Sequence, residues 1–422
     1  MNKKSNIFYG WWIVLGCFTL LLTIYPPVIN TVSVYTKPIT EALGFGRAEY
    51  MLYFTIMALA SMFGCPIVGN LIKKYDIRMI MTAGVILVSL SLIGFSCSSK
   101  LIHFYIFAIP EGLGLAATCL IPPGVLLTNW FKEKRGLAMG VALAGSGIGG
   151  AIISNFTVWL ITTYSWRTAY VVIAIIILVL SIPFTTLVIR STPEEKGLLP
   201  FGGNKAVSNK LVGLTQKETI RTLSFYLLCA AILIAGIVIN GLLVNISPYL
   251  TDIGYSAKNA GLLLSISLLT MTLGKIIIGV SYDKFGLYIT FFIVSLSSLL
   301  AVITLKSAVV LAFGIAYTIL FGIAAANITV SPSFITATLF GNKDYSSNYG
   351  IIAIFTSLAG AIAPIVSGAI YSISNSYSSL LYGYMALSVL AYILLVLAAK
   401  TKPKFDTSVI DSKGVSNEEE SI

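Results

Sequence analysis

The chain has 422 residues, of which 57% are hydrophobic and 10% are charged, and its mean hydropathy is +0.92. Soluble domains carry about 25% charged residues, so a water-soluble fold could not cover its surface with so few charges. The composition predicts a protein surrounded by lipid. The net charge of +11 comes from basic residues in short links between apolar runs. No basic patch with interleaved aromatic residues is present, which excludes nucleic acid as the expected partner.

The residues from which metal and nucleophile sites are built are few. The chain has five cysteines, mostly within apolar runs, and no pair has the spacing of metal ligands or of a CxxC motif. The only histidine, His103, follows a short polar link. We therefore expect no metal, no cofactor and no catalytic cluster, and we predict that the protein is not an enzyme.

Twelve apolar runs are long enough to cross a bilayer as helices, which takes about 20 residues each. They lie at about 9–34, 48–71, 78–98, 101–128, 137–162, 167–189, 222–249, 257–281, 286–305, 308–333, 349–373 and 378–399. The first run follows a basic start but is too long for a signal peptide and lacks a cleavage-like site, so we expect an uncleaved span. The expected fold class is an all-α membrane protein.

One long polar stretch, residues 190–221, divides the spans into six and six. We therefore predict an N-terminal half at 1–189, a cytoplasmic linker at 190–221 and a C-terminal half at 222–400. The remaining tail, 401–422, is polar with a closing acidic run, and we expect it to be disordered.

The distribution of lysine and arginine predicts the orientation. With the N-terminus inside, 20 of these residues lie in cytoplasmic segments and 6 in outside links. This is a positive-inside bias, and it predicts that both termini are cytoplasmic. We expect a monomer in the plasma membrane.

Two charges lie inside the predicted spans. Lys275 is the only one of 27 basic residues so placed, and Glu111 is the only one of 16 acidic residues. A charge at the centre of a membrane helix costs about 2.5–3.5 kcal/mol on insertion scales, so such residues usually face a cavity or a partner. We therefore take both as candidate functional residues.

A short link occurs twice, once in each half. The link after the second span begins at Gly69 and reads GNLIKKYDIRM, and the link after the eighth begins at Gly279 and reads GVSYDKFGLYI. The two glycines are 210 residues apart, half of the chain. A transporter built from repeated halves predicts such a recurrence.

These links resemble the loop motif G-x-x-x-D-R/K-x-G of the major facilitator superfamily. The first copy departs from it, with Lys73 where the acid is expected and Asp76 where the glycine is expected. This departure affects the charge interaction that the motif usually makes in the first copy, and it does not affect the expected fold. The resemblance assigns a conformational loop motif to Gly69, Arg78, Gly279, Asp283, Lys284 and Gly286.

Four further stretches are similar to the oxalate/formate antiporter and monocarboxylate transporter branch of that superfamily. They read YTKPITEALGFGRAEY (35–50), NWFKEKRGLAMG (129–140), STPEEKGLLPFG (191–202) and LFGNKDYSSNYGI (339–351). They occur in the expected order and cover nearly the whole chain. The resemblance implies two pseudo-symmetric halves of six helices, alternating access, and a small organic anion, typically a carboxylate, as substrate.

The resemblance also suggests a binding site. In that branch a basic residue of span eight, four positions before the motif glycine, meets the substrate carboxylate, and Lys275 stands in this position. Oxalate exchangers carry a second cation in span eleven, where this chain has Thr356 and Ser357. The cation that some monocarboxylate carriers have in span one is missing, with Asn30 close to that place. A single cation favours a monoanion over oxalate.

Each of these residues has more than one interpretation, and at least one is purely structural. Lys275 lies about six residues, roughly 9 Å, from the inner end of its span, and its head group could reach the interface. Glu111 could carry a proton, balance the charge of Lys275, or be a protonated acid bonded within the bundle. Asn30, Asn245 and Tyr317 could bond the second oxygen of the substrate or bridge two helices.

Span five is rich in glycine, and we expect it to pack closely against a moving neighbour. Its glycines are Gly136, Gly140, Gly145, Gly147, Gly149 and Gly150.

The sequence thus predicts a secondary transporter of a monocarboxylate of the lactate, pyruvate or formate class, working by proton symport or anion exchange. The alternatives are an oxalate/formate-type dicarboxylate exchanger and a drug or cation exporter that relies on Glu111. A sensor would bind the anion without moving it.

Overall fold

The computed structural model describes residues 8–202, 212–374 and 376–403. Within these ranges the chain is helical, with two isolated β-bridges, Phe131 with Phe201 and Gly213 with Gly341, in place of any strand. The tail that we expect to be disordered lies, from residue 404 onward, outside the described residues. The all-α fold class is confirmed.

The N-terminal half contains six crossings, three of them built from consecutive helical pieces. They are α1 (Gly10–Thr23) with η1 (Pro26–Asn30) and α2 (Val32–Leu43), α3 (Arg47–Leu71), α4 (Ile77–Cys97), α5 (Leu101–Leu115) with η2 (Ala116–Leu120) and α6 (Pro122–Trp130), α7 (Arg135–Thr163), and α8 (Trp166–Pro183) with η3 (Phe184–Val188). The pairs Pro26–Pro27 and Pro122–Pro123 each lie at such a change of helix type. Proline lacks the backbone N–H and clashes with the preceding turn, so π-helical turns take up the interruption.

The C-terminal half follows two short helices of the linker. The elements are η4 (Pro193–Lys196), α9 (Gln216–Ile220), α10 (Leu223–Asp252), α11 (Ala257–Lys306), α12 (Leu311–Phe340), α13 (Tyr345–Ser374) and α14 (Tyr377–Lys400). Gly286 interrupts α11, with φ 73° and ψ −169°, a conformation that glycine adopts without strain.

The break in α11 reconciles its length with a bilayer. Its apolar part, Asn259–Lys306, has 48 residues and would be about 72 Å long as one straight helix. That is more than twice the roughly 30 Å of a hydrocarbon core, so α11 makes two crossings that meet at Gly286. The described chain therefore crosses twelve times, as predicted.

The first crossing is longer than the sequence indicated. The apolar run was expected to end near residue 34, whereas α2 continues to Leu43, where Gly44 closes it with φ 70°. The added segment contains Lys37 and Glu41, which form an i,i+4 ion pair. Hydropathy detects only the part of a helix that suits lipid, so it does not predict this polar extension of the helix.

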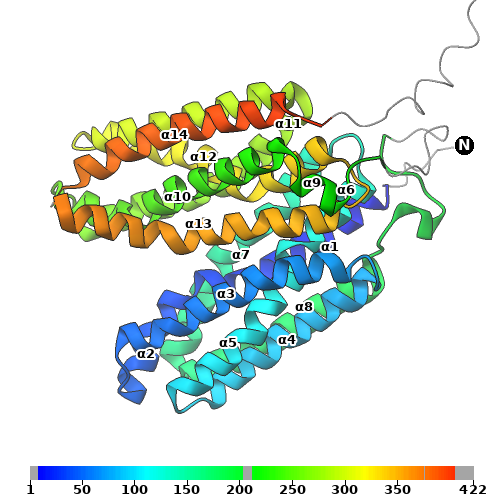
Figure 1. Ribbon diagram of the computed structural model, residues 1–422. Helices are drawn as coiled ribbons and strands as arrows, with labels where there is room; N and C mark the ends of the chain where they lie inside the picture. The colour runs from blue at the N-terminus through cyan, green and yellow to red at the C-terminus, as the bar shows by residue number, and fades with distance from the viewer. Residues whose placement is uncertain (1–7, 203–211, 375, 404–422) are drawn as a thin grey trace, which may run out of the picture.

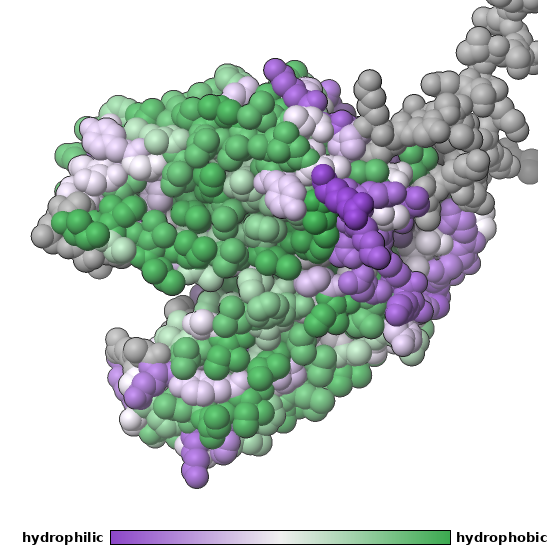
Figure 2. Space-filling model, in the orientation of Figure 1, coloured by the Kyte–Doolittle hydropathy of each residue, from purple (hydrophilic) through white to green (hydrophobic). Residues whose placement is uncertain are grey.

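The twelve crossings form two bundles that lie side by side, α1–α8 and α10–α14 (Figure 1). The bundles touch through α7 against α11 and through α3 against α13. Figure 2 shows an apolar outer surface, a hydrophilic end at which the bundles meet, and a hollow between them at the opposite end. We call the hydrophilic end the linker end, because α9 and the links before α4, α7 and α13 lie there. We call the end with the hollow the open end.

The two contacts at the linker end are related by the repeat. A Cβ atom on Gly279 would overlap the carbonyl oxygen of Gly136, and a Cβ atom on Gly69 would overlap that of Ser346. Gly69 and Gly279 are separated by 210 positions, and so are Gly136 and Ser346. The same close helix crossing is thus built twice, which is the pseudo-twofold relation expected of the halves.

Candidate functional site

The buried lysine of α11 lies at the contact between the two bundles. Lys275 is 1% exposed, and its Nζ donates hydrogen bonds to Ser146 Oγ at 2.6 Å and to the Leu143 carbonyl at 3.3 Å, both on α7. Ser146 Oγ in turn donates to the same Leu143 carbonyl. In this conformation the ammonium group joins the two halves and does not reach the surface at the linker end.

The glycines of α7 allow this contact. A Cβ atom on Gly140 would overlap the Lys275 carbonyl oxygen, and one on Gly147 would overlap Thr272 Oγ1. The close packing expected of span five is therefore observed, and α11 lies against the backbone of α7. Small residues permit such approach in lipid, and here they bring the lysine head group within reach of Ser146.

Lys275 has no counter-charge in this conformation. The described residues form three ion pairs, Lys37–Glu41, Lys73–Asp344 and Arg78–Asp76, and Lys275 belongs to none of them. Its ammonium group has three hydrogens and only two neutral acceptors. A buried charge without a partner is costly, so the site is electrostatically complementary to an anion.

Asn30 lies one helical turn away along the same face of α7. Its Nδ2 atom is the nearest neighbour of a Cβ placed on Gly150, and Gly150 is four residues beyond Ser146. The Asn30 side chain is exposed. The structure thus brings Lys275 and Asn30, which are far apart in the sequence, against consecutive turns of α7.

The other candidate substrate residues do not bond Lys275. Asn245 is half-buried and donates to the Gly241 carbonyl of its own helix. Tyr317 is buried within the C-terminal half and stacks on Phe321. Thr356 and Ser357 are half-buried on α13.

Glu111 lies inside the N-terminal bundle, on α5. It is 2% exposed, and its Oε2 atom has no hydrogen-bond partner among the described residues. The neighbouring Gly112 packs against α3, where a Cβ atom on it would overlap the Met57 carbonyl oxygen. Glu111 forms no ion pair with Lys275, so the balancing role considered for it is not formed in this conformation.

The second copy of the loop motif caps a helix of the other half. The Asp283 carboxylate accepts hydrogen bonds from the backbone N–H groups of Gly136 and Leu137, each at 2.8 Å. These groups belong to the first turn of α7, where a negative charge is favoured by the helix dipole. Lys284 is exposed.

The first copy also contacts the region just before a helix of the other half, but through an ion pair between side chains. Lys73, which is 210 residues before Asp283, forms an ion pair with Asp344 just before α13. Asp344 also accepts a hydrogen bond from the Gln216 backbone N–H at 2.8 Å. The residue 210 positions before Asp344 is Lys134. Lys73 and Asp344 therefore carry charges opposite to those of Asp283 and Lys134, the residues at the equivalent positions of the other copy.

Asp76 completes the first link locally. Its carboxylate accepts hydrogen bonds from the Arg78 backbone and side chain at 2.9 and 2.8 Å. These bonds, the one from the side chain first, lower the pKa of Asp76. Arg78 is thereby held at the start of α4 and not across the halves.

Sequence reasoning missed Ser146 and Asp344. The sequence does contain a pattern that indicates Asp344. The offset of 210 residues pairs Lys73 with Asp283 and Lys134 with Asp344, and the two residues of each pair have opposite charges. No sequence signal distinguished Ser146 from the other hydroxyl residues of apolar spans.

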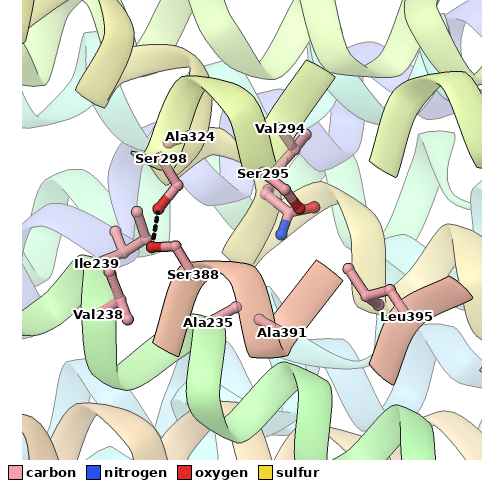
Figure 3. Close-up of a pocket in the computed structure, with 11 residues that line it drawn as sticks. Ala235, Val238, Ile239, Val294, Ser295, Ser298, Ala324, Ser388, Ala391 and Leu395 are labelled. Carbon is pink, nitrogen blue, oxygen red and sulfur yellow. Dashed lines mark hydrogen bonds between the residues drawn. The ribbon is translucent and has the colours of Figure 1, made fainter. Parts of the chain in front are cut away.

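A small cavity inside the C-terminal half is separate from this site. Figure 3 shows it between α10, α11, α12 and α14, with Ser298 and Ser388 joined by a hydrogen bond of 3.0 Å at its wall. Its volume is about 20 Å³, which holds one water molecule. A carboxylate molecule does not fit, so this cavity is not the anion site.

The chain is similar to a family model, to curated proteins and to solved structures. The family model described as Major Facilitator Superfamily matches residues 8–305 and 228–416. Monocarboxylate transporter 12 of Homo sapiens is 25% identical over 412 residues, with 88% of this chain and 77% of that protein covered. Monocarboxylate transporter 13 of Bos taurus is 24% identical, with 96% and 95% covered. A solved proton:xylose symporter superposes with a TM-score of 0.71 at 12% identity, covering 94% of this chain and 96% of that chain.

Proposed function

This chain belongs to the Major Facilitator Superfamily, and on that premise we propose that it moves a small monocarboxylate across a membrane by alternating access, with Lys275 as the cation that binds it. The class we propose is that of lactate, pyruvate and formate. The relatives named monocarboxylate transporters cover most of the chain, which supports a substrate of this kind.

The observation that carries the proposal is the environment of Lys275. A buried ammonium group with only the Ser146 hydroxyl and the Leu143 carbonyl as acceptors gains most from an anion. The ammonium group already makes charge-assisted hydrogen bonds to these two neutral acceptors, and a carboxylate adds the attraction of an opposite charge. At 4 Å and an effective dielectric of 20, the attraction is about 4 kcal/mol, and desolvation of both charges offsets much of it.

Anion binding would also act on the contact between the halves. The bonds of Lys275 to α7 help to hold the linker end closed while the open end is hollow (Figure 2). An anion that enters from the open end competes with Ser146 and Leu143 for the same ammonium group. When Lys275 turns toward the anion, α7 and α11 lose those bonds, and the conformation closed at the linker end becomes less favoured.

The selectivity that we propose follows from the number of cations. Lys275 alone can neutralise one carboxylate, and Thr356 and Ser357 offer hydroxyl groups where a second cation would be needed for oxalate. Asn30, exposed one turn along α7, is suited to donate to the second oxygen of a monocarboxylate. Tyr317 and Asn245 would have to change partners or position to take part.

We propose a monomer in the plasma membrane with the linker end in the cytoplasm, because 20 basic residues lie in the segments assigned to that side and 6 in the others. Transport would proceed by proton symport, with Glu111 as the proton carrier, or by anion exchange. An exporter of cations that relies on Glu111 is less well supported, because Glu111 lies within one bundle and not between the two.

Counterflow in proteoliposomes tests the proposal. Vesicles loaded with unlabelled lactate, pyruvate or formate should accumulate the labelled anion transiently, and Lys275→Ala should abolish this while Lys100→Ala, which removes an exposed lysine, should not. A sensor would bind the anion without counterflow. Equal counterflow in both variants would remove Lys275 from the mechanism.

A further inference from the structure

A second buried polar cluster lies inside the N-terminal half, away from Lys275. Three of its side-chain oxygens, Glu111 Oε2, Tyr35 OH and Thr157 Oγ1, have no hydrogen-bond partner among the described residues, and each residue is at most 2% exposed. Buried polar atoms are nearly always bonded. Tyr35 OH and Thr157 Oγ1 face each other, so it is the Glu111 oxygen that indicates a bond formed with water or with a mobile proton.

Tyrosine side chains connect these atoms. Tyr35 stacks on Tyr170 with ring centroids 3.9 Å apart, and the hydroxyl oxygens of Tyr170 and Tyr50 are 3.5 Å apart. Tyr50 lies beside Tyr53, with ring centroids 4.8 Å apart. Glu111 lies on a helix that packs against α3, because a Cβ atom on the neighbouring Gly112 would overlap the carbonyl oxygen of Met57, one turn beyond Tyr53.

The cluster extends from the open end toward the middle of the bundle. Measured along the helices from the open end at 1.5 Å per residue, Tyr50 lies about 5 Å deep, Tyr170 about 6 Å, Tyr53 about 9 Å and Glu111 about 15 Å. The Cα atoms of these three tyrosines therefore lie nearer to the open end than the Cα atom of Glu111 does. A hydroxyl both accepts and donates a hydrogen bond, as a proton relay requires.

No cation of the described residues neutralises the Glu111 carboxylate, so the charge of this group depends on whether it binds a proton. The α3 helix presents Tyr50 and Tyr53 to it, and the only charged residue of α4, Arg78, lies at the opposite end of that helix. No cation of the described residues pairs with Glu111 within 4 Å. An ionised Glu111 would be a buried charge without compensation, whereas the neutral acid needs only a hydrogen bond.

We propose that Glu111 and the hydroxyls of Tyr50, Tyr53, Tyr170 and Tyr35 form a proton-binding site that is loaded from the open end. A hydronium ion gives its proton to the first hydroxyl oxygen, and each hydroxyl passes its own hydrogen to the next oxygen, directly or through one water. The Glu111 carboxylate becomes the acid, every tyrosine is restored, and one water molecule remains in the medium.

The site is linked to the anion site through one helix. Tyr35 faces Thr157 of α7, and Thr157 is eleven residues beyond Ser146, the residue that Lys275 contacts on the same helix. Movement of α7 therefore reaches both sites. This coupling rests on the proposed function, whereas proton binding at Glu111 does not.

Infrared difference spectroscopy on the full-length protein tests the proton site without any substrate. At a pH where exposed carboxyl groups are ionised, the wild type should keep a C=O stretching band of a protonated carboxylic acid, and Glu111→Gln should lose it. Tyr53→Phe should shift the band. A matched control is Tyr384→Phe, which removes a buried hydroxyl bonded to Ser367 in the other half and should leave the band unchanged.

A pH jump tests the relay. Tyr50→Phe should slow protonation of Glu111 about a hundredfold, the lower end of the range for loss of a positioned proton-transfer group, while Tyr384→Phe should not. If Glu111→Gln fails to fold, Glu111→Asp keeps the acid and should move the band. A band that is unchanged in the Glu111 variants, or equal rates in Tyr50→Phe and wild type, would overturn the proposal. A proton site without counterflow of any monocarboxylate would reject the proposed substrate alone.

Discussion

The inverted ion pair between Lys73 and Asp344 gives a prediction specific to this chain. It joins the link before α4 to the start of α13 at the closed linker end, so it stabilises the conformation that is hollow at the open end. Lys73→Asp replaces the attraction by repulsion between two carboxylates. We expect this variant to populate the conformation closed at the open end more strongly than the wild type does.

The structure sets the size of the effect. The side chains of Lys73 and Asp344 are 35% and 14% exposed, so water screens the pair. Exposed pairs contribute about 0.2–1 kcal/mol, and the repulsion adds a similar amount. A total of about 0.4–2 kcal/mol changes the ratio of the two conformations about 2- to 30-fold. The exchange of both residues, Lys73→Asp with Asp344→Lys, should restore the ratio, because it restores the attraction between the two side chains.

Double electron–electron resonance can measure that ratio. Spin labels at position 100 in the N-terminal half and position 307 in the C-terminal half, both exposed at the open end, report its width once the exposed Cys97 is replaced by serine. The shorter distance should gain population in Lys73→Asp and lose it again in the double variant. Identical distance distributions in all three proteins would refute the role of this pair.

Three further predictions concern the ligands. Ser146→Ala removes the 2.6 Å acceptor of Lys275, a bond to a charged group that contributes about 1.5–3 kcal/mol. The Kd for a monocarboxylate should therefore fall about ten- to hundredfold by calorimetry, and a raised Kd would contradict the competition between Ser146 and the anion. Glu111→Gln should abolish uptake driven by a proton gradient but spare counterflow, and unchanged accumulation would leave Glu111 a structural role. In direct binding at neutral pH, every effective monocarboxylate should bind more tightly than oxalate, and a preference for oxalate over all of them would sink the argument from a single cation.

Most of the fold was predictable because lipid imposes a strong length rule. Apolar runs of about 20 residues gave all twelve crossings, including the two that meet at Gly286 within one 50-residue helix. The extension of the first crossing to Leu43 was not predictable from hydropathy, since those turns lie outside the apolar run. The changes of helix type at Pro26 and Pro122 depend on how neighbouring helices accommodate a missing N–H group.

The residues of the candidate site could be selected from the sequence to the extent that charge is scarce within the spans. Lys275 and Glu111 were identified because a charge within an apolar span is costly, and Asp283 because its motif is repeated. Ser146 could not be found in this way, because a serine in a membrane helix usually bonds its own backbone, as this one also does with Leu143. Its second bond, to Lys275, depends on the crossing of α7 and α11, which only the structure supplies.

The central claim is that an anion binds at Lys275, and the most direct test is the Kd of a monocarboxylate together with its uptake for wild type, Lys275→Ala and Lys275→Arg at matched abundance. A hydrogen-bonded charge contributes about 1.5–3 kcal/mol, so Lys275→Ala should weaken binding about ten- to hundredfold and abolish uptake in parallel. Lys275→Arg keeps the charge in a wider, planar group and should retain part of both. Binding and uptake by Lys275→Ala equal to those of the wild type would contradict the account.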